Sequence, residues 1–272
     1  MSGIMKIAIL GAGNIGTLVG AKLANLDSTD IFIHARGDHA ASLAVNGIAV
    51  EGVEAFSLTP NQYHVSISDV EVNSVFDGIA DVIFISSKAG DVRDLFKVAK
   101  RLCHKGTKIL VLSNGLGHLE LGIEEFGAHR MIPATTTHGA WRKNPGNIVW
   151  AGLGSINLGQ IGNSPSFEEM TELFSLLEES GLNPNWIEDG KKLIWSKVLI
   201  NIAINPIAAI TGQMNGDLLE SEIFETCAEV MLEGARVARL EGVKLDEDES
   251  LIDTLRTVLQ QTSENKCSML QD

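Results

Sequence analysis

The sequence predicts an α/β protein of two domains, a mostly parallel sheet covered by helices and then an all-helical domain. Up to about residue 165, short β-branched runs alternate with helical stretches. These runs are apolar on both faces, as strands that are buried on both faces of a parallel sheet must be. After a polar segment that ends at Pro165, only helical periodicity follows.

Each expected element follows from its pattern. Strands are predicted at residues 6–10, 30–34, 81–86 and 108–112, and helices at 14–25, 91–103, 167–180, 191–204, 221–242 and 247–270. Residues 47–58 alternate like a small antiparallel pair. Residues 147–150 and 155–158 read as a hairpin around Gly152 and Gly154, so we expect the sheet to be mixed at one edge. The domains are placed at residues 1–165 and 166–272.

The composition excludes several classes of protein. Of the 272 residues, 44% are hydrophobic and 21% are charged, which is typical of a globular chain with a sizeable core. A formal charge of −14 disfavours nucleic acids and anionic membranes as partners. The three cysteines are far apart, and the N-terminus has no basic segment followed by a long apolar run. We therefore expect a cytoplasmic protein without a signal peptide or disulfides.

A glycine-rich sequence, GAGNIG at residues 11–16, lies between the first predicted strand and the first predicted helix. In a dinucleotide-binding loop the first glycine allows a tight turn, the second lets the pyrophosphate approach, and the third lets helix and strand pack closely. GxGxxG also occurs as an ordinary glycine turn. Its position here predicts a Rossmann-type domain whose cofactor contacts are Gly11, Gly13, Asn14, Ile15 and Gly16.

The residues after the second predicted strand favour NADPH as the cofactor. A strand that serves NAD ends in a carboxylate that binds the ribose 2′-OH, whereas this strand leads into His34-Ala35-Arg36. An arginine suits the 2′-phosphate of NADPH, which a carboxylate would repel. The alternative is that Arg36 is an ordinary surface arginine in a loop.

The predicted helix that begins near residue 191 carries a polar stripe. Lys197, Asn201 and Asn205 recur at intervals of four among Ile, Leu, Val and Ala, so they share one narrow face. A desolvated lysine has a lowered pKa and can donate a proton, while the two amides can orient a small polar substrate. The alternative is the solvated face of an ordinary amphipathic helix.

Two further segments follow predicted strands, at the edge where ligands bind in such sheets. Lys88 comes after one strand and Asn114 after the next. The alternatives are that Lys88 is an ordinary surface cation and that Asn114 belongs to a simple Asn-Gly turn, and both remain open. The histidines show no metal-ligand spacing, so no metal is expected.

With these segments in order, the chain resembles the ketopantoate reductase (2-dehydropantoate 2-reductase) family over nearly its whole length. The segments that carry the resemblance are GAGNIG at 11–16, SKA at 87–89, NGLG at 114–117, TTTHGA at 135–140, WSKVLIN at 195–201 with Asn205-Pro206, and EN at 264–265 leading into SMLQD at 268–272. The resemblance implies NADPH-dependent reduction of 2-dehydropantoate to (R)-pantoate, a step toward pantothenate and coenzyme A.

The resemblance also implies roles for individual residues. Lys197 would be the general acid that protonates the ketone oxygen. Asn201 and Asn205 would hold the oxygens of the 2-oxo acid substrate, and Ser268 would bind its carboxylate. Asn114 would lie beside the nicotinamide and the reacting carbonyl.

For the cofactor, the resemblance implies that Arg36 and Lys88 hold the adenosine-phosphate end or line the cleft. The family continues beyond SMLQD to a stretch like Arg-x-Thr-Glu-Ile-Asp, whose Glu contacts the substrate hydroxyl, and then to further helices. This sequence ends at Asp272, so we expect a truncated helical domain that lacks the acidic partner. Two alternatives remain: a reductase of another branched 2-oxo acid, and an NADP-binding protein impaired in catalysis. By analogy, the helical domain is expected to carry a homodimer face.

Overall fold

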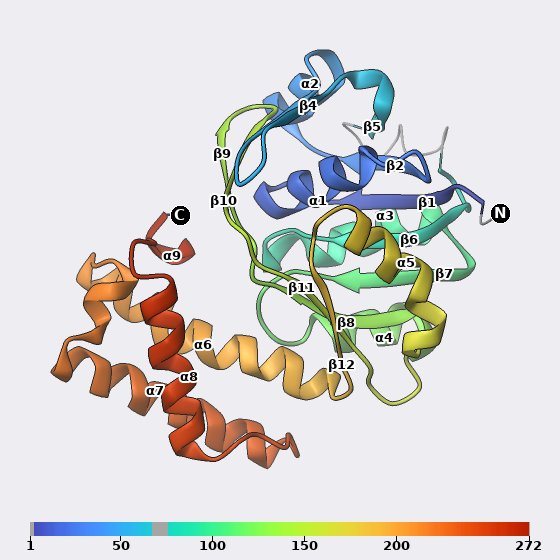
Figure 1. Ribbon diagram of the computed structural model, residues 1–272. Helices are drawn as coiled ribbons and strands as arrows, with labels where there is room; N and C mark the ends of the chain where they lie inside the picture. Colours follow the sequence, from blue (N-terminus) through green and yellow to red (C-terminus); the bar gives the residue numbers. More distant parts are fainter. Residues whose placement is uncertain (1–2, 67–75, 272) are drawn as a thin grey trace. The chain divides into compact units, whose positions relative to one another are not determined.

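The computed structural model describes residues 3–66 and 76–271, and the chain divides into two compact units, Met1–Leu193 and Ile194–Asp272 (Figure 1). This division lies later than the boundary predicted at residue 165. The reason is that β12 (Pro184–Ile187) pairs with β11 (Ile156–Gly159) and α5 (Phe167–Glu179) packs on the same sheet. Both elements thus belong to the first unit, although they follow the polar segment at Pro165.

An eight-stranded sheet forms the centre of the first unit. Its remaining strands are β1 (Met5–Leu10), β2 (Thr29–His34), β5 (His64–Ser66), β6 (Ala80–Ile85), β7 (Cys103–Val111) and β8 (Met131–Thr136). The strand order is β12-β11-β8-β7-β6-β1-β2-β5. Every neighbouring pair is parallel except β8 with β11, which confirms the expected mixed edge.

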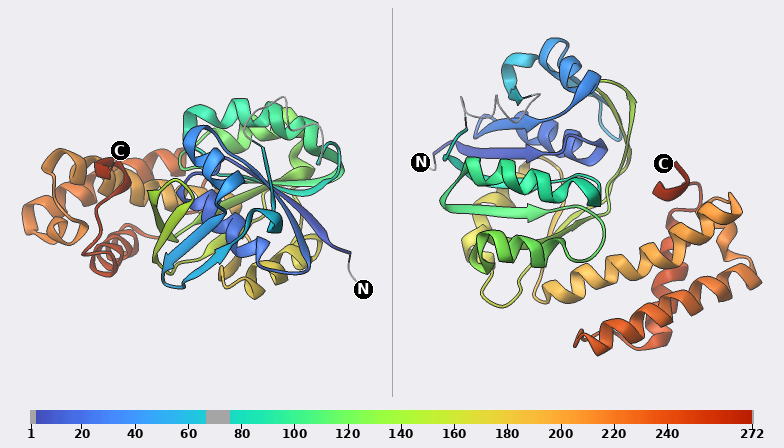
Figure 2. Two further views of the ribbon diagram at one scale, coloured as in Figure 1. Left: turned by 90° about the horizontal axis from the view of Figure 1, so that it is seen from above. Right: turned by 180° about the vertical axis from the view of Figure 1, so that it is seen from behind.

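Helices cover both faces of this sheet, as its apolar strands require. On one face α1 (Asn14–Ala24) and α5 share an apolar core with the sheet, and on the other α3 (Val92–Leu102) and α4 (His118–Phe126) form a second core. Figure 2 shows the two layers from above. The described residues also form α2 (Gly37–Val45) and the short 3₁₀ turns η1 (Pro60–Gln62), η3 (Ala89–Asp91), η4 (Ala128–Arg130) and η5 (Asn215–Leu219).

A second sheet, of order β4-β3-β10-β9, packs against α1. Its strands are β3 (Ile48–Gly52), β4 (Phe56–Leu58), β9 (Gly139–Asn144) and β10 (Asn147–Gly152). The predicted antiparallel pair at 47–58 is confirmed as β3 with β4.

The hairpin predicted between residues 147–150 and 155–158 is wrong. β10 turns back on β9 through Gly146, which has a φ of +79°, while β11 joins the large sheet. Gly154 lies against the backbone of Thr137, where an added Cβ would be 2.3 Å from the carbonyl carbon. The segment between β10 and β11 therefore follows the chain that precedes β9 and does not turn back on β10.

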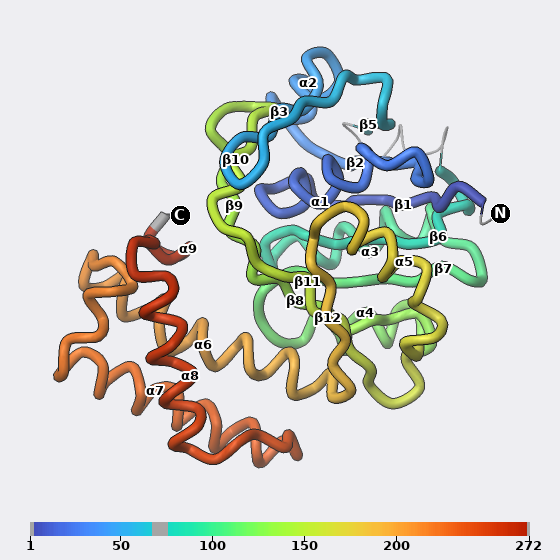
Figure 3. Tube along the Cα trace, viewed as in Figure 1, coloured from blue at the N-terminus to red at the C-terminus, as the bar shows by residue number. Residues whose placement is uncertain are grey.

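The second unit is helical, and its core lies between α6 (Gly190–Thr211), α7 (Ser221–Leu240) and α8 (Asp248–Gln261) (Figure 3). The helix predicted over 247–270 ends at Gln261, and a separate short helix, α9 (Ser268–Gln271), follows. The segment between α8 and α9 is held by the preceding turn η5, because Asn215 and Gly216 donate backbone N–H groups to the carbonyl oxygens of Asn265 and Ser263. Among the described residues, α6 alone is long and apolar enough to cross a membrane, judged by length and composition.

A buried lysine ties the second sheet to α1. Lys22 lies in the last turn of α1 and is only 7% exposed. Its ammonium group pairs with Glu54 and lies 5.3 Å and 5.4 Å from the ring centroids of Phe56 and Trp150. An ion pair and two cation–π contacts thus compensate the desolvation of this charge.

A buried histidine joins the glycine-rich loop to the turn between β9 and β10. Nδ1 of His39 accepts a hydrogen bond from the N–H of Gly146 (3.0 Å). Nε2 therefore carries the proton and donates to Oγ1 of Thr17 (3.0 Å), whose hydroxyl donates to the carbonyl oxygen of Ala12 (3.2 Å). This chain fixes His39 as a neutral imidazole, and burial together with the charge of Arg142 lowers its pKa to about 4.

Replacing Lys22 tests the first of these anchors. We expect Lys22→Ala to lower the free energy of unfolding by about 2–4 kcal/mol, because it removes the buried contacts and leaves space behind them. Chemical denaturation measures this loss. Lys97→Ala is the matched control, since Lys97 pairs with Asp94 at 2.7 Å on the exposed surface of α3. Equal losses for the two variants would contradict the assignment.

The neutral histidine predicts a pH dependence of stability. His39 has a pKa near 6.5 when unfolded and about 4 when folded, so the unfolded chain takes up the proton first as the pH falls. We expect the free energy of unfolding to decrease between about pH 6.5 and pH 4, by up to about 3 kcal/mol from this residue. Burial also lowers the pKa of His138, so His39→Gln should remove only part of the slope. An unchanged slope in that variant would exclude His39 as a source.

Candidate active site

The predicted cofactor residues lie on loops at the carboxyl edge of the large sheet. The strand order reverses beside β1: the chain runs outward through β2 and β5, then returns to β6 on the other side. Ligands bind outside the carboxyl ends of the strands at such a switch point. The glycine-rich loop follows β1, Arg36 follows β2, Lys88 follows β6 and Asn114 follows β7.

The glycine-rich loop has the close approaches that its sequence requires. Gly11 has a φ of +92°, a conformation that side chains disfavour. A Cβ on Gly16 would lie 2.3 Å from both the carbonyl oxygen of Gly11 and Oγ of Ser86, so α1 can approach the strands only with glycine here. Gly13 differs, because its Cβ would meet no described atom closer than 3.8 Å. The loop is therefore tight on its protein side and open at Gly13.

The open side of this loop fits a pyrophosphate. Gly13 is the N-cap of α1, and no side chain caps the helix. The first intrahelical bond is that of Thr17 N–H to the Gly13 carbonyl oxygen, so the N–H groups of Asn14, Ile15 and Gly16 have no acceptor within the helix. The positive end of the helix dipole adds to their attraction for an anion.

The loops after β6 and β7 are tied to one another. Oγ of Ser113 donates to the carbonyl oxygen of Ser87 (2.8 Å), which brings the Asn114 loop beside the Lys88 loop. The side chains of Lys88 and Asn114 are exposed, and the carbonyl oxygen of Asn114 is bonded to the His118 ring (3.2 Å). Both residues thus stand on the same edge as the glycine-rich loop.

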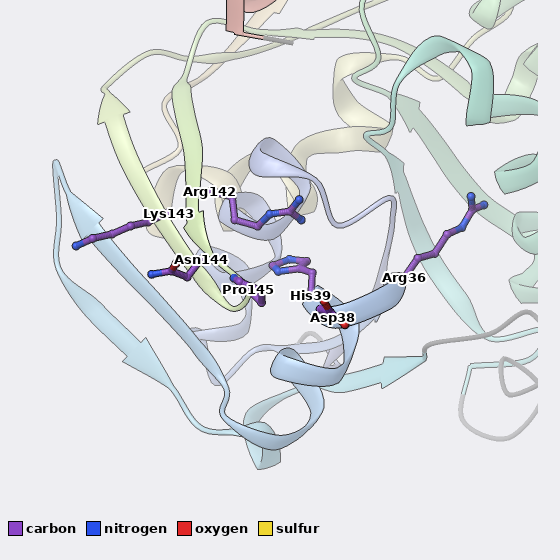
Figure 4. A pocket seen from close by; sticks show the side chains of 7 residues that line it. All are labelled: Arg36, Asp38, His39, Arg142, Lys143, Asn144 and Pro145. Atoms are coloured by element: carbon purple, nitrogen blue, oxygen red, sulfur yellow. The ribbon is translucent and has the colours of Figure 1, made fainter.

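A pocket of about 420 Å³ lies beyond the carboxyl end of β2 (Figure 4). Its lining residues are Arg36, Asp38, His39, Arg142, Lys143, Asn144 and Pro145. Arg36 is exposed and forms an ion pair with Asp91 at 3.5 Å. The position suits the adenosine ribose of a dinucleotide, and an arginine in place of an acidic residue suits a 2′-phosphate. Arg142, which the sequence analysis did not single out, comes to this pocket from β9, more than 100 residues further along the chain.

The polar stripe of α6 lies in the second unit. Lys197, Asn201 and Asn205 are all half-buried, and their side chains have no hydrogen bond or ion pair with any described residue. Burial lowers the pKa of the Lys197 amine from its usual value of 10.5. A solvated helix face would not desolvate its lysine. Three half-buried polar groups without protein partners instead offer hydrogen bonds to a ligand.

Ser268 is brought to this stripe by its neighbour in the sequence. The thiol of Cys267 donates to the backbone carbonyl oxygen of Asn205 (3.5 Å), which places the start of α9 at the Asn205 turn of α6. Ser268 is exposed there. Asp272, the last residue of the SMLQD segment, lies outside the described residues.

Asn215 is a further polar residue, bonded to the segment that leads from α8 to α9, and the sequence analysis missed it. Its Nδ2 donates to Oγ1 of Thr262 (2.9 Å), and its N–H donates to the carbonyl oxygen of Asn265. Its buried Oδ1 has no partner in the described part of the chain. An Asn-Gly dipeptide suggests a turn, so the sequence held no signal that this side chain is buried with an unused acceptor.

The structure thus groups the predicted residues by unit. The first unit holds the residues predicted for the cofactor together with Asn114, and the second holds Lys197, Asn201, Asn205 and Ser268. No group of three His, Cys, Asp or Glu side chains in residues 3–66 and 76–271 could hold a metal ion.

Two family models and a curated relative match this chain. The model of the family "Ketopantoate reductase PanE/ApbA" matches residues 7–163, and that of its C-terminal part, "Ketopantoate reductase PanE/ApbA C terminal", matches residues 189–272. A 2-dehydropantoate 2-reductase from Pyrococcus horikoshii is 35% identical over 98% of this chain and 84% of its own length.

Solved structures show the same fold. The 2-dehydropantoate 2-reductase from Geobacter metallireducens matches with a TM-score of 0.86 at 26% identity, over 98% of this chain and 86% of that one. A dimeric ketopantoate reductase from Staphylococcus aureus matches with a TM-score of 0.74 at 22% identity, over 98% and 84%. On the two family matches and the identity to the Pyrococcus enzyme, this chain belongs to the ketopantoate reductase family.

Proposed function

We propose that this protein is an NADPH-dependent oxidoreductase that reduces 2-dehydropantoate to (R)-pantoate, a step toward pantothenate and coenzyme A. The observation that carries the assignment is the stripe of Lys197, Asn201 and Asn205, half-buried and without protein partners in a helix that is otherwise apolar. Membership of the family supplies the substrate, and the stripe supplies the groups that a 2-oxo acid needs.

The first unit holds the cofactor in this proposal. The N–H groups of Asn14, Ile15 and Gly16 bind the pyrophosphate, and Gly13 lets it approach the backbone. Arg36 binds the 2′-phosphate, and Lys88 lines the cofactor site. When bound, NADPH supplies the hydride that reduces the carbonyl carbon.

Lys197 is the proton donor in this reaction. Its ammonium group donates to the ketone oxygen as that oxygen gains negative charge, which gives the hydroxyl of pantoate. The lowered pKa of Lys197 suits this role, because an ammonium of lower pKa releases its proton more readily. Solvent then restores the proton. The aliphatic surroundings of α6 strengthen the electrostatic attraction between ammonium and oxyanion.

The other polar groups orient the substrate. The amides of Asn201 and Asn205 each offer two donors and one acceptor to the substrate oxygens, so they hold the carbonyl in a fixed direction. Ser268 binds the carboxylate from the start of α9. Asn114 lies beside the nicotinamide and the reacting carbonyl.

The same proposal includes a cytoplasmic location and a homodimer. The one helix of membrane-spanning length among the described residues carries the polar stripe, which would be costly in lipid, so we infer that α6 is a core helix of the enzyme. The dimeric state of the ketopantoate reductase from Staphylococcus aureus supports the homodimer.

The decisive experiment is NADPH oxidation by the full chain with 2-dehydropantoate, for the wild type and for Lys197→Ala. We expect turnover in the wild type and a loss of about 10²- to 10⁴-fold in kcat in the variant. Its NADPH affinity should stay within a few-fold. The wild-type rate should also decline with rising pH, at a pH below the usual lysine value of 10.5, as Lys197 loses its proton.

The control for Lys197 is Lys191→Ala, on an exposed position of the same helix, which should leave kcat unchanged. Near-normal turnover of Lys197→Ala would exclude Lys197 as the acid. Wild-type turnover of another branched 2-oxo acid in preference to 2-dehydropantoate would correct the substrate. NADPH binding without turnover of any such acid would indicate a cofactor-binding protein.

Ser268 is tested by the separation of KM from kcat. Ser268→Ala should raise KM for the oxo acid about tenfold, because a charge-assisted hydrogen bond is lost, and should change kcat much less. Steady-state kinetics with saturating NADPH measures both constants. An unchanged KM would argue against a carboxylate contact at this residue.

A further inference from the structure

The pocket beyond β2 has more positive than negative charge. Arg36, Arg142 and Lys143 line it, against the single carboxylate of Asp38. His39 also lines it and is neutral above about pH 4. The chain as a whole has a net charge of −14, so this pocket is a local region of positive charge on a negatively charged protein.

The three cations differ in how they are paired. Nζ of Lys143 lies 2.9 Å from the Glu51 carboxylate, and Arg36 lies 3.5 Å from that of Asp91. Arg142 has neither a hydrogen bond nor an ion pair with any residue in 3–66 or 76–271. Burial and, as the smaller cause, the charge of Arg142 lower the pKa of the His39 ring. Arg142 is therefore the cation of this pocket that is left for a ligand.

Arg142 is also held in place by its strand. The turn that follows it is anchored on α2 by the bond from Gly146 N–H to His39 and by the bond from Oγ of Ser42 to the carbonyl oxygen of Pro145 (3.0 Å). Figure 4 shows the end of the Arg142 side chain beside the His39 ring, while Arg36 lies at the other end of the pocket with its side chain extended away from both. The pocket thus has one arginine from β9 and one from the start of α2.

We propose that Arg142 is a second specificity-determining residue for the cofactor, which binds the 2′-phosphate of NADPH from the β9 side while Arg36 binds it from the α2 side. This inference rests on the proposed use of NADPH and adds to it a residue outside the dinucleotide-binding motif. A phosphate monoester carries up to two negative charges and three acceptor oxygens, so two guanidinium groups can bind it at once. NADH has only a hydroxyl at this position, so it cannot use the charge of Arg142.

The test is a fluorescence titration of NADPH and of NADH with the full chain. In Arg142→Ala we expect NADPH affinity to fall tenfold or more, as about 1.5–3 kcal/mol per charge-assisted contact implies, and NADH affinity to change less than about twofold. Arg142→Lys should keep part of the preference for NADPH, since it keeps the charge without the planar fork. Lys97→Ala is the control and should leave both affinities unchanged, because Lys97 does not line this pocket and pairs with Asp94 on the exposed surface of α3.

Three outcomes would overturn the inference: a wild type that binds NADPH and NADH equally, an Arg142→Ala variant that keeps the wild-type preference, or equal losses for both cofactors. The last would indicate a structural role. Binding is measured without substrate, so failure of the proposed function and failure of this inference can be told apart. A wild type that prefers NADPH but does not turn over 2-dehydropantoate would contradict the proposed function, while the binding test of Arg142 would still decide this inference.

Discussion

The close packing at Gly16 is the contact on which the cofactor half of this protein depends. α1 approaches the loop after β1 and the end of β6 so closely that one added methyl group would lie 2.3 Å from two oxygen atoms. A side chain there would move α1 away from the sheet, and with it the N–H groups of its first turn. The hydroxyl of the next residue, Thr17, is hydrogen-bonded to the His39 ring, and the same ring accepts a hydrogen bond from the N–H of Gly146. The glycine at position 16 thus allows the close packing that positions the N-terminus of α1, the glycine-rich loop and the turn between β9 and β10.

Electrostatics imposes the second constraint, because an acidic protein must bind two anions. The 14-unit excess of negative charge lies mostly in residues 166–272, whereas the cations proposed for the cofactor all lie in the first unit. Of these, Arg142 lacks a carboxylate partner within the described residues. In the second unit the proposed substrate site relies on one lysine, two amides and the hydroxyl of Ser268. A neutral amide binds an oxyanion without adding a charge that must be desolvated.

The sequence predicted β1, β2, β6 and β7 of the large sheet and the helices α1 and α3, because these elements follow from local patterns. Residues 6–10 and 81–86 are apolar on both faces, and GAGNIG marks a strand-to-helix turn. The errors came where pairing partners are distant. The strand predicted at 147–150 was expected to pair with residues 155–158, which follow it, but the structure pairs β10 with β9 on one side and with β3, about 100 residues earlier, on the other. Residues 184–187 joined the sheet although their surroundings are helical.

By itself the sequence determined the chemistry of the candidate site: the glycine-rich loop, the arginine after β2 and the spacing of Lys197, Asn201 and Asn205 on one helix face. These features are local, since a turn or a helical repeat brings its residues together without help from the rest of the chain. Only the tertiary structure placed Ser268 at the Asn205 turn, buried Asn215 with an unused acceptor and brought Arg142 to the pocket beyond β2. Each of these depends on contacts between residues far apart in the chain, and no local pattern records which distant segments will pack together.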